Sequence, residues 1–208
     1  MDKSSEYYKL SRPEVQNFLP ESFNSLLDVG CGYGNFGREV KEAKKCLVWG
    51  IEPEEKAYNE ANKQLDKAFL GTFEDAYDKI ENNFDVITFN DVLEHTIDPW
   101  SILAKTKTLL SENGIIVSSI PNILHFYAIK DILLQKDWQY AREGIMDKTH
   151  LRFFTKRSMV RMFEESGLEV IKIVGINPVV SRGAWLLSTL SFGYYDELKY
   201  PQFLIMGR

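Results

Sequence analysis

Short apolar runs alternate with polar, helix-like stretches along most of the chain. The apolar runs occupy residues 25–29, 46–51, 67–70, 84–89, 115–120 and 168–174. The run at 84–89 is nearly continuous, which is typical of a strand covered on both faces. Helix signals fill the stretches 35–44, 53–65, 99–110 and 155–166. This alternation predicts an α/β fold with a mostly parallel sheet.

Residues that start or stop helices mark the ends of these elements. Pro53 suits the first turn of a helix, and Thr155 suits a helix N-cap. We expect Asn113-Gly114 to close the helix that runs to Leu110, and Pro121 to stop the strand at 115–120.

Three segments interrupt the alternation, at residues 1–24, 122–154 and 175–200. We expect all three to be cap segments. The first predicts a leading helix and loop, the second is aromatic with a helix around His125, and the third is irregular and aromatic. Residues 203–206 predict a final strand, antiparallel beside the strand at 168–174. The whole predicts one domain over 1–208, a doubly wound, Rossmann-like sheet of seven strands with cap insertions. Such sheets bind ligands at the carboxyl ends of their strands.

Composition narrows the function classes. The 208 residues carry a net charge of −5, with one dense basic stretch at 148–161, so we expect no nucleic acid as partner. The cysteines, Cys31 and Cys46, form no disulfide framework, and no signal peptide or membrane span is visible. We therefore expect a cytoplasmic protein that does not bind membranes. The three histidines are far apart in sequence, and we expect no metal.

A glycine-rich stretch follows the first predicted strand. Gly32, Gly34 and Gly37 match the dinucleotide fingerprint, and Glu52 stands where that fingerprint places its ribose-binding acid. However, Asp28 directly before the turn would repel a pyrophosphate and would suit a cationic ligand. S-adenosylmethionine carries an ammonium and a sulfonium and has no phosphate. NAD, and a tight turn without a ligand, remain as alternatives at this point.

Two motifs resemble a known family. Residues 27–34, Leu-Asp-Val-Gly-Cys-Gly-Tyr-Gly, resemble motif I of class I S-adenosylmethionine-dependent methyltransferases. Residues 84–95, Phe-Asp-Val-Ile-Thr-Phe-Asn-Asp-Val-Leu-Glu-His, resemble their fourth-strand motif, especially in the ubiquinone/menaquinone-type and surface-polysaccharide-associated branches. Residues 147–155, Asp-Lys-Thr-His-Leu-Arg-Phe-Phe-Thr, are similar to a stretch in bacterial members of the second branch.

The resemblance implies S-adenosylmethionine as cofactor and assigns its contacts. It places the methionine part at Asp28 and the glycine turn, the ribose at Glu52, and the sulfonium end near Asn90 and Asp91. The adenine contact stays open among Thr72, Phe73, Glu74 and Asp75, because Thr72 follows Gly71 where the family often has an acid. The implied cofactor-binding residues are Asp28, Gly30, Gly32, Tyr33, Gly34, Glu52, Phe73, Glu74, Asn90 and Asp91.

The acceptor side is less defined. A protonated acceptor needs a general base, for which His95 and His150 are the candidates, with packing or helix capping as the alternative. Arg152 suits an acceptor phosphate or carboxylate, and the aromatic residues Tyr127 and Trp138 suit a pocket wall.

The function expected is methyl transfer to an oxygen or nitrogen of a small molecule. The resemblance suggests a sugar or a nucleotide-linked sugar of surface polysaccharide synthesis as the acceptor. An NAD-dependent oxidoreductase and a non-catalytic, methyltransferase-like binding module are the alternatives, and a homodimer is left open.

Overall fold

The computed structural model describes residues 12–179 and 181–208. Residues 1–11, nearly half of the leading segment 1–24, therefore lie outside the described residues. The strands are β1 (Ser25–Val29), β2 (Leu47–Glu52), β3 (Lys67–Leu70), β4 (Phe84–Asn90), β5 (Leu110–Pro121), β6 (Val170–Ile176) and β7 (Gln202–Gly207). The α-helices are α1 (Pro13–Gln16), α2 (Asn35–Lys44), α3 (Glu55–Gln64), α4 (Phe73–Tyr77), α5 (Pro99–Lys107), α6 (Phe126–Gln135), α7 (Lys156–Glu165) and α8 (Arg182–Leu190).

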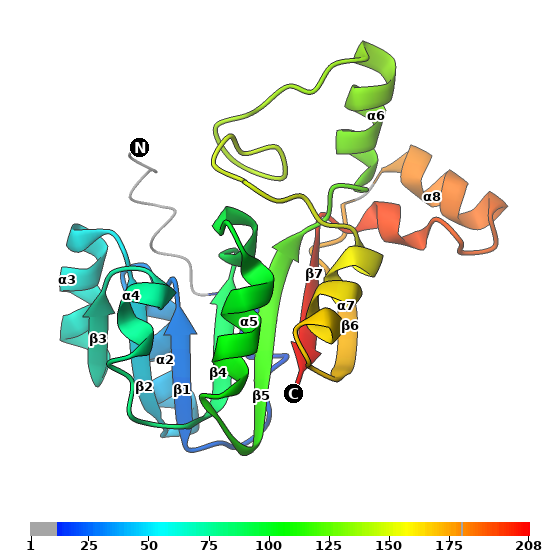
Figure 1. Cartoon of the computed structure of the whole chain (residues 1–208). Helices are drawn as coiled ribbons and strands as arrows, with labels where there is room; N and C mark the ends of the chain where they lie inside the picture. Colours follow the sequence, from blue (N-terminus) through cyan, green and yellow to red (C-terminus); the bar gives the residue numbers. More distant parts are fainter. Residues whose placement is uncertain (1–11, 180) are drawn as a thin grey trace.

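The strands form one sheet in the order β3-β2-β1-β4-β5-β7-β6 (Figure 1). The pairs from β3 to β5 are parallel, and β7 lies antiparallel between β5 and β6. This arrangement confirms the doubly wound sheet and the antiparallel last strand. The chain reverses its direction of travel across the sheet between β1 and β4, and a ligand site is expected at the strand ends there.

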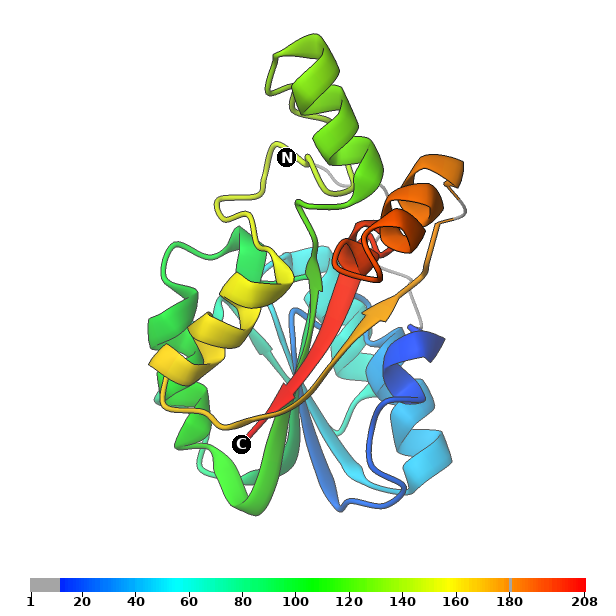
Figure 2. The ribbon, with the colours of Figure 1, turned by 90° about the vertical axis from the view of Figure 1, so that its right-hand side faces the viewer.

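Helices cover both faces of the sheet, with a separate hydrophobic core on each (Figure 2). Alternate residues of a strand point to opposite faces. In β1, Leu27 therefore packs in the core under α4, α5 and α7, whereas Leu26 packs in the core under α1, α2 and α3. Both side chains are fully buried, which explains why the strands read as continuous apolar runs.

Two sequence-based predictions of elements were wrong, and one helix was missed. Helix α5 ends at Lys107, and β5 already begins at Leu110, so the turn predicted at Asn113-Gly114 lies within the strand. The pairing of β4 with β5 is irregular there, because it passes from Leu110 to Ile115. Helix α4 was not predicted, although Thr72 caps it with a capping box. Residues 175–200 are not irregular throughout, since Ser181 caps helix α8.

The cap segments lie at the carboxyl end of the sheet. Helix α6 has no buried residue and stands away from the sheet (Figure 1). It meets α8 near its start, where a Cβ added to Gly183 would lie 2.3 Å from the ring of Phe126. Several large apolar side chains of these helices are exposed, among them Leu134 and Leu190. Within the described residues, none of the helices combines the length and hydrophobicity needed to cross a bilayer.

Candidate functional site

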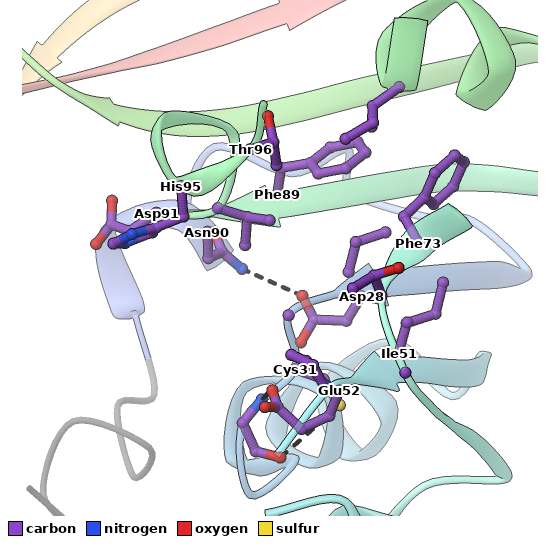
Figure 3. Close-up of a pocket in the computed structure, with 18 of the residues that line it drawn as sticks. Asp28, Cys31, Ile51, Glu52, Phe73, Phe89, Asn90, Asp91, His95 and Thr96 are labelled. Atoms are coloured by element: carbon purple, nitrogen blue, oxygen red, sulfur yellow. Dashed lines mark hydrogen bonds between the residues drawn. The ribbon is translucent and has the colours of Figure 1, made fainter. Parts of the chain in front are cut away.

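A cavity of about 640 Å³ opens at the carboxyl ends of β1 to β4 (Figure 3). Its wall combines the turns after these four strands with Arg12 and with part of the 149–151 loop. This volume falls within the range of pockets that enclose small organic ligands. The cavity therefore lies where the sheet topology predicts a site.

The glycine turn after β1 forms the base of the cavity. Gly30 has a φ of 73°, and a Cβ at this position would lie 2.5 Å from Val92 Cγ2. Only glycine fits this combination of left-handed backbone and close approach. The amides of Gly30 and Cys31 both donate to the Ile51 carbonyl, at 2.8 and 3.0 Å, so the turn is held against the end of β2.

The carboxyl group of Asp28, in β1, lies buried beside this turn, and the residue is only 2% exposed. The Thr88 hydroxyl donates to Asp28 Oδ1 at 2.8 Å, and the Asn90 amide does so at 3.3 Å (Figure 3). Burial raises the pKa of Asp28 to about 7, and the hydrogen bond from Thr88 offsets only part of this effect. A cation bound next to Asp28 would stabilise its ionised form.

Glu52, at the end of β2, connects two turns of the cavity. Its Oε2 accepts from the Gly32 amide at 2.8 Å, and its Oε1 accepts from the Glu54 amide at 3.0 Å. Burial raises the pKa of Glu52, while these backbone hydrogen bonds lower it. An ionised carboxylate has about four acceptor sites, so Glu52 can still accept from ligand hydroxyl groups.

Arg12 reaches the cavity from the chain segment before α1. Its guanidinium forms an ion pair with Asp91, whose carboxylate also accepts from Ser119 Oγ at 2.9 Å and from Gln202 Nε2 at 2.8 Å. Asp91 is thus anchored to β5, β7 and the N-terminal segment at once. Sequence reasoning missed Arg12, because a single arginine in a polar segment carries no motif.

The turn after β3 lines the opposite end of the cavity. Thr72, Phe73 and Glu74 contribute to the wall, whereas Asp75 does not. Asp75 instead accepts from the Thr72 amide and hydroxyl, each at 2.9 Å, within the cap of α4. Hydrogen bonds from Thr72 lower the pKa of Asp75. Of the four residues that the sequence left open for an adenine contact, three thus line the cavity.

The two candidate bases lie together at the cavity mouth. His95 lines the cavity and ends the short 3₁₀ helix η2 (Leu93–His95). His150 lies behind it, with the two ring centroids 4.7 Å apart, and does not line the cavity. The buried Glu94 carboxylate is 4.0 Å from His150 Nε2. Histidine spacing in the sequence did not predict this cluster, because the histidines come from separate loops.

The remaining sequence-predicted residues lie outside the cavity wall. Tyr33 and Gly34 belong to the glycine turn but do not line the cavity, and the Tyr33 carbonyl accepts from Gln64. Arg152 donates through Nε and Nη2 to the Ile97 carbonyl, at 3.2 and 2.6 Å. It therefore fixes the 149–152 loop to the turn after β4.

The two predicted wall aromatics belong to the cap. Trp138 packs edge-on against Phe153 with centroids 4.9 Å apart, and Tyr127 lies on α6 and is 43% exposed. Neither residue is among those that line the cavity.

The chemistry of the cavity suits a cationic, hydroxyl-bearing ligand. Asp28 and Glu52 are two buried carboxyl groups on one wall, and a pyrophosphate there would be repelled. The turn after β1 nevertheless allows close approach of a ligand to the backbone.

Comparison with known proteins agrees with this geometry. A family described as a methyltransferase domain matches residues 5–173. A ubiquinone biosynthesis O-methyltransferase of Thiobacillus denitrificans is 29% identical over 176 residues, covering 79% of this chain and 74% of that protein. Another protein of that name, from Pasteurella multocida, is 28% identical over 192 residues, covering 84% of this chain and 78% of its own length.

Solved structures share the fold. A methyltransferase dependent on S-adenosylmethionine (SAM) from Archaeoglobus fulgidus has a TM-score of 0.69 at 15% identity, and the match covers 98% of this chain and 94% of that one. A SAM-dependent methyltransferase from Thermotoga maritima, described as a possible histamine N-methyltransferase, has a TM-score of 0.64 at 17% identity, covering 98% and 89%. At these identities the likeness concerns the fold alone.

Proposed function

This chain belongs to the methyltransferase-domain family and is a class I SAM-dependent methyltransferase, and from that premise we propose that it methylates an oxygen or nitrogen of a small molecule. The observation that carries the proposal is the cavity itself, whose wall combines the buried carboxyl groups of Asp28 and Glu52 with His95. In-line methyl transfer requires the cofactor and the acceptor to be aligned with water excluded. In this proposal 1–208 form one domain with 122–154 and 175–200 as its cap.

The methionine part of SAM binds at the turn after β1 in this proposal. Asp28 attracts the ammonium group, and the Gly30–Gly32 backbone allows the close approach. Arg12 pairs with the methionine carboxylate, because guanidinium groups bind carboxylates bidentately. Asn90 and Asp91 lie at the sulfonium end. The location of Arg12 in the cavity wall beside Asp91 supports this placement.

The nucleoside part extends toward β2 and β3. Glu52 accepts from the ribose hydroxyls, while Phe73 and Glu74 lie beside the adenine. Tyr33 and Gly34 act indirectly, by keeping the turn in shape. The position of all these residues at the ends of neighbouring parallel strands supports the assignment.

The acceptor enters on the side of His95 and the 149–151 loop. We propose a hydroxyl group as the methylated group, with His95 and His150 as the residues that activate it. A hydrogen bond from His95 Nδ1 to the Thr149 carbonyl, 3.1 Å apart, leaves Nε2 as the acceptor nitrogen of the neutral ring, which supports a role in removing a proton. Arg152, Tyr127 and Trp138 belong to the cap in this proposal and contact only acceptors that extend beyond the cavity.

Two acceptor classes are supported by different observations. The stretch 147–155 favours a sugar or nucleotide-linked sugar, by its resemblance to surface-polysaccharide-associated members. The relatives named ubiquinone biosynthesis O-methyltransferases favour transfer to an oxygen of a quinone-like molecule. Radiolabelled methyl transfer from SAM to a panel of nucleotide sugars and quinols separates the two classes.

Calorimetric titration with S-adenosylhomocysteine and with NAD tests the cofactor part. We expect binding of the homocysteine compound and none of NAD. Absence of S-adenosylhomocysteine binding at high micromolar concentration would overturn the proposal. Tight binding combined with no transfer to any acceptor of the panel would instead favour a non-catalytic binding module.

A further inference from the structure

Two loops that are far apart in the chain are joined at the cavity mouth. The amides of Leu151 and Arg152 donate to the Glu94 carbonyl, at 2.8 and 3.0 Å. The Arg152 side chain adds its two hydrogen bonds to Ile97. These contacts fix the 147–152 loop against η2 and bring His150 beside Glu94 and His95.

Two further contacts fix the tautomers of the neutral imidazole rings. His95 Nδ1 lies 3.1 Å from the Thr149 carbonyl oxygen, and His150 Nδ1 lies 3.0 Å from the Ile145 carbonyl oxygen. A carbonyl only accepts, so each Nδ1 carries the hydrogen and each Nε2 of a neutral ring carries a lone pair. Histidines that bind metal ions are held in the same way by backbone carbonyls.

The 147–152 loop is itself rigidly organised. Asp147 Oδ1 accepts from the Thr149 amide at 2.8 Å and from the Thr149 hydroxyl at 2.7 Å. Asp147 is buried and its carbonyl accepts from the His150 amide at 3.0 Å. The carbonyl that orients His95 and the ring of His150 are therefore both positioned by one compact turn.

Three ligand atoms converge as a result. One atom each from Glu94, His95 and His150 lie within 4.8 Å of one another. Glu94 is 1% exposed and His150 is 8% exposed. Two neutral imidazoles and one carboxylate form a ligand set typical of divalent transition metals. Ligand atoms on one such ion are about 3 to 3.5 Å apart, so binding requires each atom to move inward by about 1 Å or less.

We infer that Glu94, His95 and His150 bind a divalent transition-metal ion at the acceptor side of the cavity. Three protein ligands leave positions open on the ion for an oxygen atom of the acceptor. With the ion bound, the two Nε2 atoms hold the ion and no longer act as bases. A metal-bound hydroxyl loses its proton to water more readily than a free one, so the ion would favour methylation at oxygen. Ion binding stands on the geometry alone, whereas its role in activating the acceptor rests on the proposed function.

The test is titration of the purified chain with Co²⁺, followed by visible absorption, and with Zn²⁺ by calorimetry, in the absence of any cofactor. We expect one ion per chain. Glu94→Gln and His150→Gln should each weaken ion binding at least tenfold. His125→Gln is the matched control, since His125 lies outside the cluster, and it should bind the ion as the wild type does.

Titration of each variant with S-adenosylhomocysteine then shows that the fold and the cofactor pocket are intact. Equal ion affinity in the wild type and His150→Gln would overturn the inference, as would no ion binding by a wild type that binds S-adenosylhomocysteine. A wild type that binds the ion normally but does not bind S-adenosylhomocysteine would instead overturn the proposed function. Methyl transfer that is unchanged after chelation would overturn the activating role of the ion.

Discussion

At the residue scale, Asp28 combines two opposed requirements. Its carboxyl group must be ionised to attract a cation, yet burial raises its pKa to about 7. Glu52 adds to this effect as a nearby negative charge, while Thr88, Asn90 and Arg12 lower the pKa. The apoprotein therefore holds a group whose charged form is unfavourable until a ligand arrives.

Asp28→Asn should stabilise the apoprotein at high pH. The folded pKa is raised above the unfolded value of about 3.9, so the folded chain retains a proton that the unfolded chain releases. The free energy of unfolding of the wild type thus falls between about pH 4 and pH 7, by at most about 4 kcal/mol. Asp28→Asn has no titrating group at this position, so its free energy of unfolding does not fall for this reason. Urea unfolding of both proteins at pH 5 and pH 8 measures it, and a difference that does not change with pH would refute the role of burial.

Cofactor affinity should fall as the pH drops below about 7. Protonation of Asp28 removes the charge that attracts the ammonium group, and the affinity then decreases about tenfold per pH unit. Calorimetry with S-adenosylhomocysteine from pH 5.5 to pH 8 measures this slope. Asp28→Asn should bind weakly at every pH, with a flat profile, and a wild type that also gives a flat profile would contradict the assignment.

At the element scale, the turn after β1 requires glycine at position 30, because its backbone is left-handed and because it lies close to Val92, which follows β4. Gly30→Ala should destabilise the fold through both its φ of 73° and the 2.5 Å approach to Val92. Gly193 is a matched control, because it has a φ of 86° with no neighbouring atom within 4 Å of an added Cβ. Gly193→Ala should cost about 1 kcal/mol, and Gly30→Ala roughly 1–3 kcal/mol more.

The two glycine variants also separate stability from binding. Gly30→Ala should weaken S-adenosylhomocysteine binding at least tenfold, whereas Gly193→Ala should leave it unchanged. Thermal unfolding and calorimetry of both variants provide the comparison. Equal loss of stability in the two variants would show that Val92 moves away from the added Cβ without lowering the free energy of unfolding.

The segment before α1 supplies the contact to the methionine carboxylate in our proposal. Arg12→Ala should therefore weaken binding of S-adenosylhomocysteine but not of methylthioadenosine, which lacks the amino-acid part. Gln202→Ala is the matched control, because it also removes one partner of Asp91 yet lies outside the cavity wall. An equal loss for both ligands in Arg12→Ala would point to a role in folding rather than in recognition.

The elements that the sequence predicted are those with a regular pattern or a continuous run of apolar residues. β1 and β4 were predictable because burial on both faces makes most of their residues apolar, as for Leu26 and Leu27. Helix α4 was missed because only the cap at Thr72 and Asp75 marks its five residues. Helix α8 was missed because its exposed apolar side chains, such as Leu190, hide the polar pattern of a surface helix.

The residues of the site also fall into a part that the sequence predicts and a part that it does not. The turn after β1 was predictable because glycine and Asp28 are required by local geometry and charge. The pairing of Arg12 with Asp91, and of His150 with Glu94, depends on contacts between distant segments. Such contacts leave no spacing in the sequence that marks them, so only the folded arrangement reveals them.

At the scale of the whole molecule, the cavity draws on residues from the first segment to the 149–151 loop. A ligand bound there connects β1, β2, β3 and β4 with the N-terminal segment, so its binding energy should appear in global unfolding. A ligand at a hundred times its dissociation constant stabilises a folded protein by about 2.7 kcal/mol. For a chain of this size, that corresponds to a rise in Tm of about 5–11 °C.

We therefore expect saturating S-adenosylhomocysteine to raise the Tm by this amount, and NAD at the same concentration to leave it unchanged. Differential scanning fluorimetry measures both. Asp28→Asn should lose the shift while keeping a cooperative transition, since the substitution removes a charge and not the packing around it. A shift caused by NAD, or one that persists in Asp28→Asn, would be incompatible with the cofactor geometry, because the buried carboxyl groups of Asp28 and Glu52 select a cation and repel a pyrophosphate.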